Sequence, residues 1–218
     1  KHSRQFGEEF AENLLEIGDF NRKMFIPPLI KKPQFLHEEK APLEKALSAV
    51  EKGNAMHLVL QHVDMNDLRN EEAIKHQVDR LVEKEIMLKK EAEAVNISVI
   101  YEFFYSNLGQ RMISALKVSR EAPFNIDIRS RDIRPDLSPE LYDGETIMLQ
   151  GVIDCYFQEG DDLILIDYKT GRMQQEYSQQ VNYYADVLEK VTGKKVKEKY
   201  IVMLPVNKKE KLEIICVV

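Results

Sequence analysis

The feature that most constrains the fold of this chain is an unbroken apolar run, residues 163–166, followed directly by Asp167, Tyr168 and Lys169. A run without alternating polar residues is typical of a strand that is buried on both faces of its sheet. Because side chains two positions apart share one face of a strand, Asp167 and Lys169 should lie on the same side, about 7 Å apart. The run therefore predicts a covered sheet with an acid and a base at one strand end.

The rest of the chain predicts an α/β protein, more closely an α+β sandwich in which helices flank a mixed central sheet. Apolar residues in the first half have helical spacing, whereas those in the second half alternate or form short runs bounded by turns. The predicted order is helices followed by β-β-β-α-β-β. The expected helices are 42–63, 97–116, 175–191 and one that begins after Asn70, and the expected strands are 124–128, 147–157, 163–168, 200–204 and 212–218.

Two domains are expected along the chain. Residues 1–40 predict a short helix and an extended arm that contains prolines, which we interpret as a linker from an upstream domain. Residues 41–218 form the second expected domain. The chain does not begin with Met, which suggests a fragment of a longer protein.

Composition excludes some classes of protein and leaves others open. No apolar run approaches the roughly 20 residues that a membrane-spanning helix needs, so we expect no membrane contact. Cys155 and Cys216 have no zinc-binding spacing, and we expect both to be reduced and buried in a protein of the cytoplasm. The formal net charge of −6 argues against a globally basic surface for nucleic acid, but a nuclease needs only a local acidic cluster for metal ions.

Asp154 is the residue that turns the strand end into a candidate metal site. A turn at Gly160 and Asp161 would place Asp154 opposite Asp167 on the neighbouring strand. Two carboxylates that meet in this way repel each other unless a divalent cation lies between them or one is protonated. Mg²⁺ prefers oxygen ligands and keeps several waters, and a metal-bound water beside Lys169 can attack a phosphodiester. The alternative interpretation is a solvated ion pair between Asp167 and Lys169.

Four other side chains are candidates for such a site, although each also has a simpler explanation. Gln180 and Tyr184 share one face of the predicted helix, where packing alone would explain them. His57 could bind a metal, because Gly53 one turn earlier removes side-chain bulk, or it could be a core histidine. Glu121 is expected to be a rim carboxylate or an ion-pair partner.

In their order along the chain, these motifs resemble the RecB-family branch of the PD-(D/E)xK nucleases, and most closely the nuclease domain of AddA-type helicase–nuclease subunits. The resemblance covers roughly residues 35–205 and implies a restriction-endonuclease-like core with an N-terminal helical region. The motifs that carry it are Gly53-x-x-x-His57, Gly151-x-x-Asp154, Asp167-Tyr168-Lys169 and Gln180-x-x-x-Tyr184.

The resemblance implies a role for each matched position. Asp154 and Asp167 would bind a catalytic Mg²⁺, with Mn²⁺ as a substitute. His57 and the backbone carbonyl of Tyr168 would be further ligands of the same ion. Lys169 would orient or activate the attacking water and stabilise the transition state.

By the same resemblance, Gln180 and Tyr184 would brace the site or contact DNA. The parent enzyme would unwind duplex DNA with ATP while this exonuclease domain cuts the emerging 3′-terminated single strand, in double-strand-break repair. Its partners would be the helicase part of its own chain and a separate protein of the AddB/RexB type. Asn54 stands where the family often has Thr, a mild departure beside the histidine motif.

Two absences narrow this interpretation. The chain has no GxxxxGK[ST] phosphate loop, so it is not itself the ATP-driven motor. Its two cysteines cannot hold an iron–sulfur cluster, which takes four, so that branch of the family is excluded. A catalytically idle domain that binds DNA or a partner protein stays open as an alternative, and so does a self-standing exonuclease.

Overall fold

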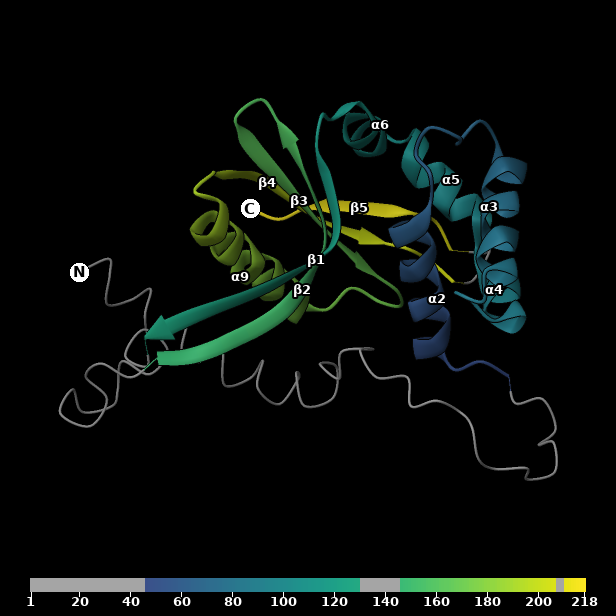
Figure 1. Ribbon diagram of the computed structural model, residues 1–218, viewed down its shortest axis with the longest axis horizontal. Coiled ribbons are helices and arrows are strands. Elements are labelled where there is room, and N and C mark those ends of the chain that lie inside the picture. The colour runs from purple at the N-terminus through teal and green to yellow at the C-terminus, as the bar shows by residue number, and fades with distance from the viewer. Residues whose placement is uncertain (1–45, 130–145, 207–209) are drawn as a thin grey trace, which may run out of the picture. The chain divides into compact units, whose positions relative to one another are not determined.

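The structure, a computed structural model, describes residues 46–129, 146–206 and 210–218 (Figure 1). The helix and arm predicted for residues 1–40 therefore lie outside the described residues. Within the described ranges, no helix is long and apolar enough to cross a membrane.

Two compact units make up the chain. Strands β1 (Val118–Arg129) and β2 (Thr146–Glu159) run through both units. The first unit includes residues 123–152, of which only the outer lengths of these two strands are described. The second unit, residues 45–122 and 153–218, carries every candidate site residue.

The strands form one mixed sheet in the order β1-β2-β3-β4-β5. β2 pairs antiparallel with β3 (Asp162–Lys169), β3 pairs parallel with β4 (Val196–Met203), and β4 pairs antiparallel with β5 (Glu213–Cys216). A parallel pair needs a crossover connection, and helix α9 (Gln175–Thr192) supplies it between β3 and β4. The predicted mixed sheet and the order β-β-β-α-β-β are confirmed.

The hairpin between β2 and β3 decides which residues lie opposite each other. Cys155 pairs with Ile166, so the next positions in this register are Asp154 and Asp167. Gly160 makes the turn with a φ of +63°, a left-handed backbone that glycine adopts without a steric penalty. The hairpin register predicted from the sequence is therefore confirmed.

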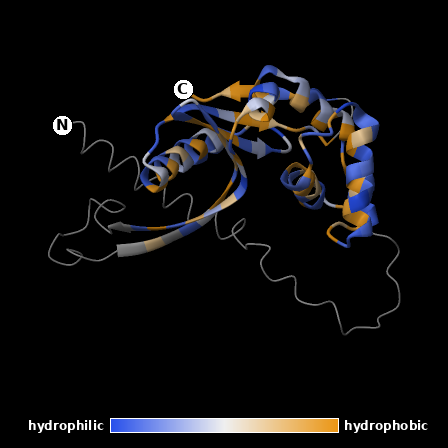
Figure 2. Cartoon of the chain, turned by 45° about the horizontal axis from the view of Figure 1, so that its top comes forward, coloured by the Kyte–Doolittle hydropathy of each residue, from blue (hydrophilic) through white to orange (hydrophobic). Residues whose placement is uncertain are grey.

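Strand β3 is covered on both faces, as its apolar run predicts, because residues 163–168 are all buried. Ile164, Ile166 and Tyr168 belong to a hydrophobic core shared with the helices of the first half. Helix α9 also contacts β3 and β4. Figure 2 shows the central strands as largely hydrophobic and the helices with hydrophilic residues along one side. The first-half helices are α2 (Ala49–His62), α3 (Glu71–Glu83), α4 (Lys89–Ala94), α5 (Ile97–Tyr105) and α6 (Asn107–Ser114).

The helix predicted at 97–116 is interrupted, so its prediction as one helix is wrong. Ser106 has an extended backbone, with a ψ of 163°, and its hydroxyl accepts the N–H of Gly109 to cap the second helix. A Cβ at Gly109 would lie 2.2 Å from the carbonyl oxygen of Phe103. Glycine therefore allows the close turn between α5 and α6.

The first predicted helix starts later than the apolar pattern indicates. Ser48 and Glu51 form a capping box, so α2 begins at Ala49 rather than at residue 42. Helix α4 is absent from the prediction because its six residues bury no side chain and leave no apolar stripe in the sequence.

The two cysteines differ in their exposure. Cys155 is buried in β2, whereas Cys216 is exposed, so the prediction that both are buried is wrong. The reason is position, because β5 is an edge strand of the sheet. An apolar strand sequence does not by itself distinguish an edge strand from a central one.

Candidate active site

Helix α2 brings His57 to the end of the sheet through close packing at Gly53. A Cβ at Gly53 would lie 2.7 Å from Thr170 Oγ1, so glycine lets the helix approach the residues after β3. One turn later, the His57 ring meets the Tyr168 ring edge to face, with 6.1 Å between the ring centroids. Gly53 does make room, but the room is occupied by Thr170 rather than by the imidazole.

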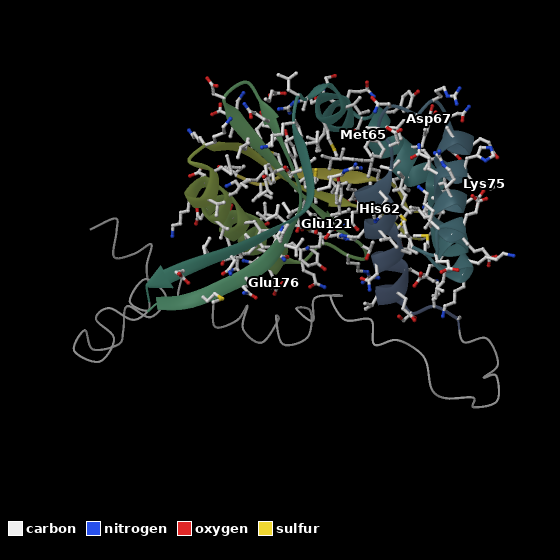
Figure 3. All side chains as sticks on the ribbon, viewed as in Figure 1. His62, Met65, Asp67, Lys75, Glu121 and Glu176 are labelled. Atoms are coloured by element: carbon white, nitrogen blue, oxygen red, sulfur yellow. The ribbon has the colours of Figure 1, made fainter. Side chains whose placement is uncertain are left out.

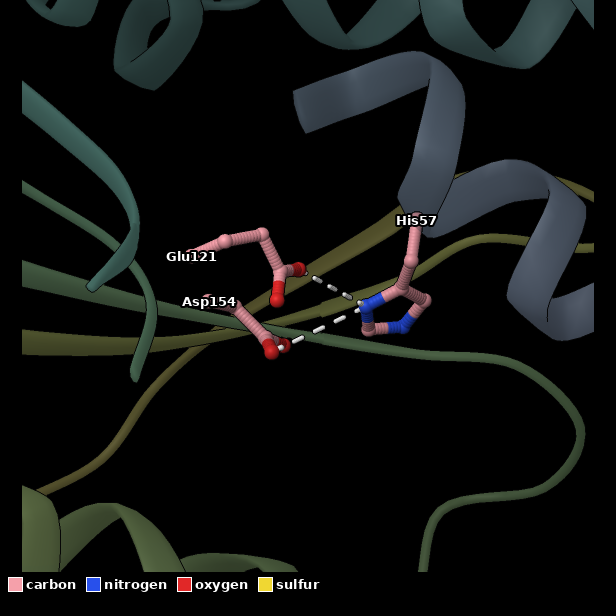
Figure 4. A group of neighbouring side chains, drawn as sticks. All are labelled: His57, Glu121 and Asp154. Carbon is pink, nitrogen blue, oxygen red and sulfur yellow. Dashed lines mark ion pairs between the residues drawn. The ribbon is translucent and has the colours of Figure 1, made fainter. Parts of the chain in front are cut away.

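His57, Glu121 and Asp154 converge from α2, β1 and β2 (Figure 4). His57 Nδ1 lies 3.9 Å from Glu121 Oε1 and 3.7 Å from Asp154 Oδ1. One ligand atom from each residue lies within 4.8 Å of the other two. The carboxylates suit Mg²⁺ or Mn²⁺, and the imidazole suits a first-row transition metal, so this donor set fits a divalent cation.

The pKa of His57 shows that this cluster attracts positive charge. Burial lowers the pKa of the imidazole, but the carboxylates of Asp154 and Glu121 raise it more, and the net shift is upward. A metal ligand must be neutral imidazole, so a cation entering the cluster would displace the proton. Proton and cation therefore compete for the same negative charge.

Asp167 lies deeper, at the end of β3, with 1% of its surface exposed. Burial raises its pKa to about 6; Lys169 opposes this shift and Asp154 adds to it. Lys169 Nζ lies 2.7 Å from Asp167 Oδ2, yet no described residue makes a well-directed hydrogen bond to that oxygen. The distance establishes an ion pair, and the missing hydrogen bond leaves the oxygen with capacity for another partner.

Lys169 is enclosed between Asp167 and Tyr177 of α9. Its Nζ lies 5.3 Å from the centroid of the Tyr177 ring, a cation–π distance, and 12% of its side chain is exposed. Burial lowers the pKa of Lys169, but the carboxylates of Asp167 and Asp154 raise it more, so the net shift is upward. This burial excludes the alternative of a solvated surface ion pair.

Asp154 is held in orientation by the backbone of β3. Its Oδ2 accepts the N–H of Tyr168 at 2.8 Å, and its Oδ1 is the oxygen nearest His57 Nδ1. The Tyr168 hydroxyl contacts Met112 Sδ at 3.9 Å within the core. The role of the Tyr168 carbonyl as a metal ligand stays a prediction.

Gln180 and Tyr184 lie on α9 and contact each other, as their spacing predicts. Gln180 Nε2 donates a hydrogen bond of 2.8 Å to the Tyr184 hydroxyl. Burial raises the pKa of Tyr184, and the negative charges of Asp167 and Asp154 raise it further. The helix that follows the hairpin therefore brings this pair near the two acids.

The sequence profile of the PD-(D/E)XK nuclease superfamily matches residues 32–215. The chain belongs to this superfamily. Its curated relatives include the AddA-type ATP-dependent helicase/nuclease of Clostridium acetobutylicum, 42% identical over 94% of the chain. The corresponding protein of Thermoanaerobacter sp. strain X514 is 45% identical over 85% of the chain. The chain spans 17% and 15% of the length of these two relatives. Among solved structures, that of SSO0001 aligns with 77% of this chain and 75% of its own, at 12% identity and a TM-score of 0.35.

Membership of the PD-(D/E)XK nucleases confirms the family and the fold that the motifs predict. The AddA-type branch is confirmed as well, because its helicase/nuclease proteins are about 40% identical over most of the chain. Nucleases of this superfamily use divalent metals, and the cluster of His57, Glu121 and Asp154 is the group of described residues that fits one.

Glu121 is the member of this nuclease site whose part in the cluster the sequence did not indicate. The structure bears out the expectation of an ion-pair partner, which is His57, and adds the approach to Asp154. The backbone at Glu121 has a φ of +48°, which residues with a Cβ rarely adopt. No pattern around Arg120 and Glu121 indicates this conformation, because the segment has the composition of an ordinary strand start.

Proposed function

We propose that this chain is a divalent-metal-dependent deoxyribonuclease domain that hydrolyses phosphodiester bonds in single-stranded DNA. The observation that carries the proposal is the convergence of His57, Glu121 and Asp154 beside the buried pair of Asp167 and Lys169. Anionic metal ligands next to an ammonium are the groups that metal-assisted phosphodiester hydrolysis needs. Membership of a nuclease superfamily supports the same chemistry.

The cation would be held by the three clustered side chains, with Asp167 placed by the hairpin register to join Asp154. A bound Mg²⁺ or Mn²⁺ supplies a Lewis acid for the phosphate and lowers the pKa of water. Tyr168 contributes through its N–H, which keeps one oxygen of Asp154 occupied and leaves the other beside His57. The protein therefore sets the ligand geometry before the cation arrives.

Lys169 would supply positive charge beside the reacting phosphate. Its raised pKa keeps it an ammonium at neutral pH, so it would donate hydrogen bonds rather than abstract a proton. The ion pair with Asp167 fixes one side of the ammonium, and the Tyr177 ring limits the other. We therefore assign Lys169 to orienting the attacking water and stabilising the charge that develops on the phosphate.

Gln180 and Tyr184 would brace the site or contact the DNA backbone. The raised pKa of Tyr184 keeps its hydroxyl protonated, so it can donate to a phosphate oxygen. Gln180 Oε1 is buried and has no hydrogen-bond partner among the described residues. That oxygen could accept a hydrogen bond from an ordered water or from a donor on the substrate.

We further propose that the domain works in an AddA-type helicase–nuclease of the bacterial cytoplasm, in double-strand-break repair. The support is that its relatives are named as ATP-dependent helicase/nucleases, together with the 15% to 17% of their length that the chain spans. A motor elsewhere in such a protein would feed the 3′-terminated strand to this site. A protein of the AddB/RexB type would be the partner.

Cleavage of a single-stranded oligonucleotide, labelled at either end, tests the nuclease assignment. We expect cleavage in Mg²⁺ or Mn²⁺, none in EDTA, and a loss of about 100- to 1000-fold in Asp154→Asn and in Lys169→Met. The control Asp162→Asn changes an acid at the hairpin turn and should cleave like the wild type. Equal cleavage by all four proteins would overturn the assignment.

The same material separates the alternatives. A chain that binds Mn²⁺ in calorimetry but cleaves no DNA, alone or with its helicase, would support the catalytically idle domain. Digestion of duplex ends without any motor would support the self-standing exonuclease. The label that survives cleavage reports which end of the strand is attacked.

A further inference from the structure

We propose that Arg120 is a positioning residue of the metal site, because it fastens β1 to the C-terminal end of α2 and so holds Glu121 toward His57. This inference rests on the proposed function, in which Glu121 and His57 are ligands of the cation. A guanidinium is itself positive and has no acceptor, so Arg120 does not bind the cation. It acts through its neighbour in the chain.

The contact of Arg120 is with the unsatisfied end of α2. Its Nη1 donates to the carbonyl oxygen of Leu60 at 3.1 Å and to that of Val63 at 2.6 Å. Helix α2 ends at His62, so the two acceptors belong to its last turn and its C-cap. The last carbonyls of a helix lack partners within the helix, and positive charge is favoured there. Arg120 therefore ties β1 to the point at which α2 ends.

Arg120 and Glu121 are consecutive, yet both side chains reach α2. In a regular strand successive side chains point to opposite faces, so only one of the two could do so. Glu121 breaks the regularity with its φ of +48°, a left-handed backbone that is strained for any residue with a Cβ. In Figure 3, Glu121 lies on β1 beside α2, whose last residue, His62, is also labelled.

Strain of this kind persists only where the surrounding structure holds it in place. The two hydrogen bonds of Arg120 hold the residue before the strained position, and the approach of Glu121 to His57 lies directly after it. Without the guanidinium, β1 is free to relax to an extended φ at residue 121. The carboxylate would then turn away from His57, and the cluster would lose one of its two carboxylates.

Mn²⁺ affinity, measured by titration calorimetry on the 218-residue chain, tests this inference. We expect Arg120→Gln to weaken Mn²⁺ binding by about 10- to 100-fold, the usual effect of removing a residue that orients a metal ligand. Arg111→Gln is the matched control, because Arg111 also joins elements, through ion pairs of 2.9 Å to Glu159 and 2.8 Å to Glu198. It should bind Mn²⁺ like the wild type.

A double-mutant cycle shows whether Arg120 acts through Glu121. In a Glu121→Ala background, Arg120→Gln should weaken Mn²⁺ binding no further. A merely structural role of Arg120 in holding α2 would act on His57 as well, and its effect would add in full to that of Glu121→Ala. Full additivity, or wild-type affinity in Arg120→Gln alone, would overturn the inference.

Two further measurements keep the result unambiguous. If Arg120→Gln does not fold in urea titrations, Arg120→Lys replaces it; the lysine keeps the charge without the planar fork, and we expect an intermediate loss of affinity. Wild-type affinity in Arg120→Lys, with α2 intact, would count against the inference. A wild-type chain that binds no Mn²⁺ would overturn the proposed function and this inference together, whereas normal binding in the variant overturns the inference alone.

Discussion

Asp167 and Lys169 are opposite charges that the fold buries together, and their balance depends on pH. Burial raises the pKa of Asp167 to about 6, so its carboxylate is ionised at pH 7 by a narrow margin. Lys169, whose pKa is shifted upward, stays charged throughout this range. A residue pair of this kind stabilises the folded chain less than its short distance suggests, because both charges leave water.

The metal-free chain should lose the contribution of Asp167 to its stability as the pH rises from about 4 to about 6. In this interval the folded chain keeps the proton on Asp167 while the unfolded chain has released it, so rising pH opposes folding. The shift from 3.8 to about 6 corresponds to at most about 3 kcal/mol. Urea unfolding in EDTA at several pH values measures this dependence. Asp167→Asn should remove it and Asp162→Asn should not; an unchanged pH dependence in Asp167→Asn would contradict the shifted pKa.

At the scale of single residues, the sequence predicts some of the site and misses the rest for a physical reason. The position of Asp154 opposite Asp167 follows from a turn at Gly160, because a hairpin fixes its own register. The turn of Glu121 toward His57 does not follow, because it depends on a left-handed backbone at a residue type that does not favour one. Tertiary contacts select that conformation, and no local pattern reveals them.

Among the elements, α2 depends on one close approach to the sheet. Gly53→Ala gains about 1 kcal/mol in helix propensity but places a Cβ 2.7 Å from Thr170 Oγ1, and such overpacking costs about 1–3 kcal/mol. We expect a net loss of about 1 kcal/mol in the free energy of unfolding and weaker Mn²⁺ binding, because α2 carries His57. Urea unfolding and calorimetry measure the two effects.

Thr170→Ala provides the control for this change, because it removes the oxygen that the new Cβ would meet. The double variant Gly53→Ala/Thr170→Ala should recover both stability and Mn²⁺ affinity relative to Gly53→Ala. If the double variant is no better than Gly53→Ala, the contact between α2 and Thr170 does not position His57.

The elements themselves show where sequence patterns are informative. Strand β3 and helix α9 were predictable to within one or two residues, because one is continuously apolar and the other has helical periodicity ending at Gly193. The break between α5 and α6 was not, since apolar spacing continues across Ser106 and a serine within a helix looks the same as a serine that caps the next one. Helix α4 buries nothing, so periodicity cannot reveal it.

For the whole molecule, a cation that binds only the folded chain must stabilise it. At a Mn²⁺ concentration 100 times the dissociation constant, the free energy of unfolding should rise by about 2.7 kcal/mol. Urea unfolding with Mn²⁺ and with EDTA measures the difference. The gain should vanish in Asp154→Asn and persist in Asp162→Asn; a gain of equal size in Asp154→Asn would place the cation elsewhere on the chain.

The side chains that would face the cation come from positions 57, 121, 154 and 167, on one helix and three different strands. No short stretch of the chain holds the site, and β3 contributes only after most of the chain has been made. A ribosome-bound chain that ends before residue 167 therefore carries no complete cutting centre. A protein that degrades DNA in this way is harmless during most of its own synthesis, and a copy broken between these strands is disarmed.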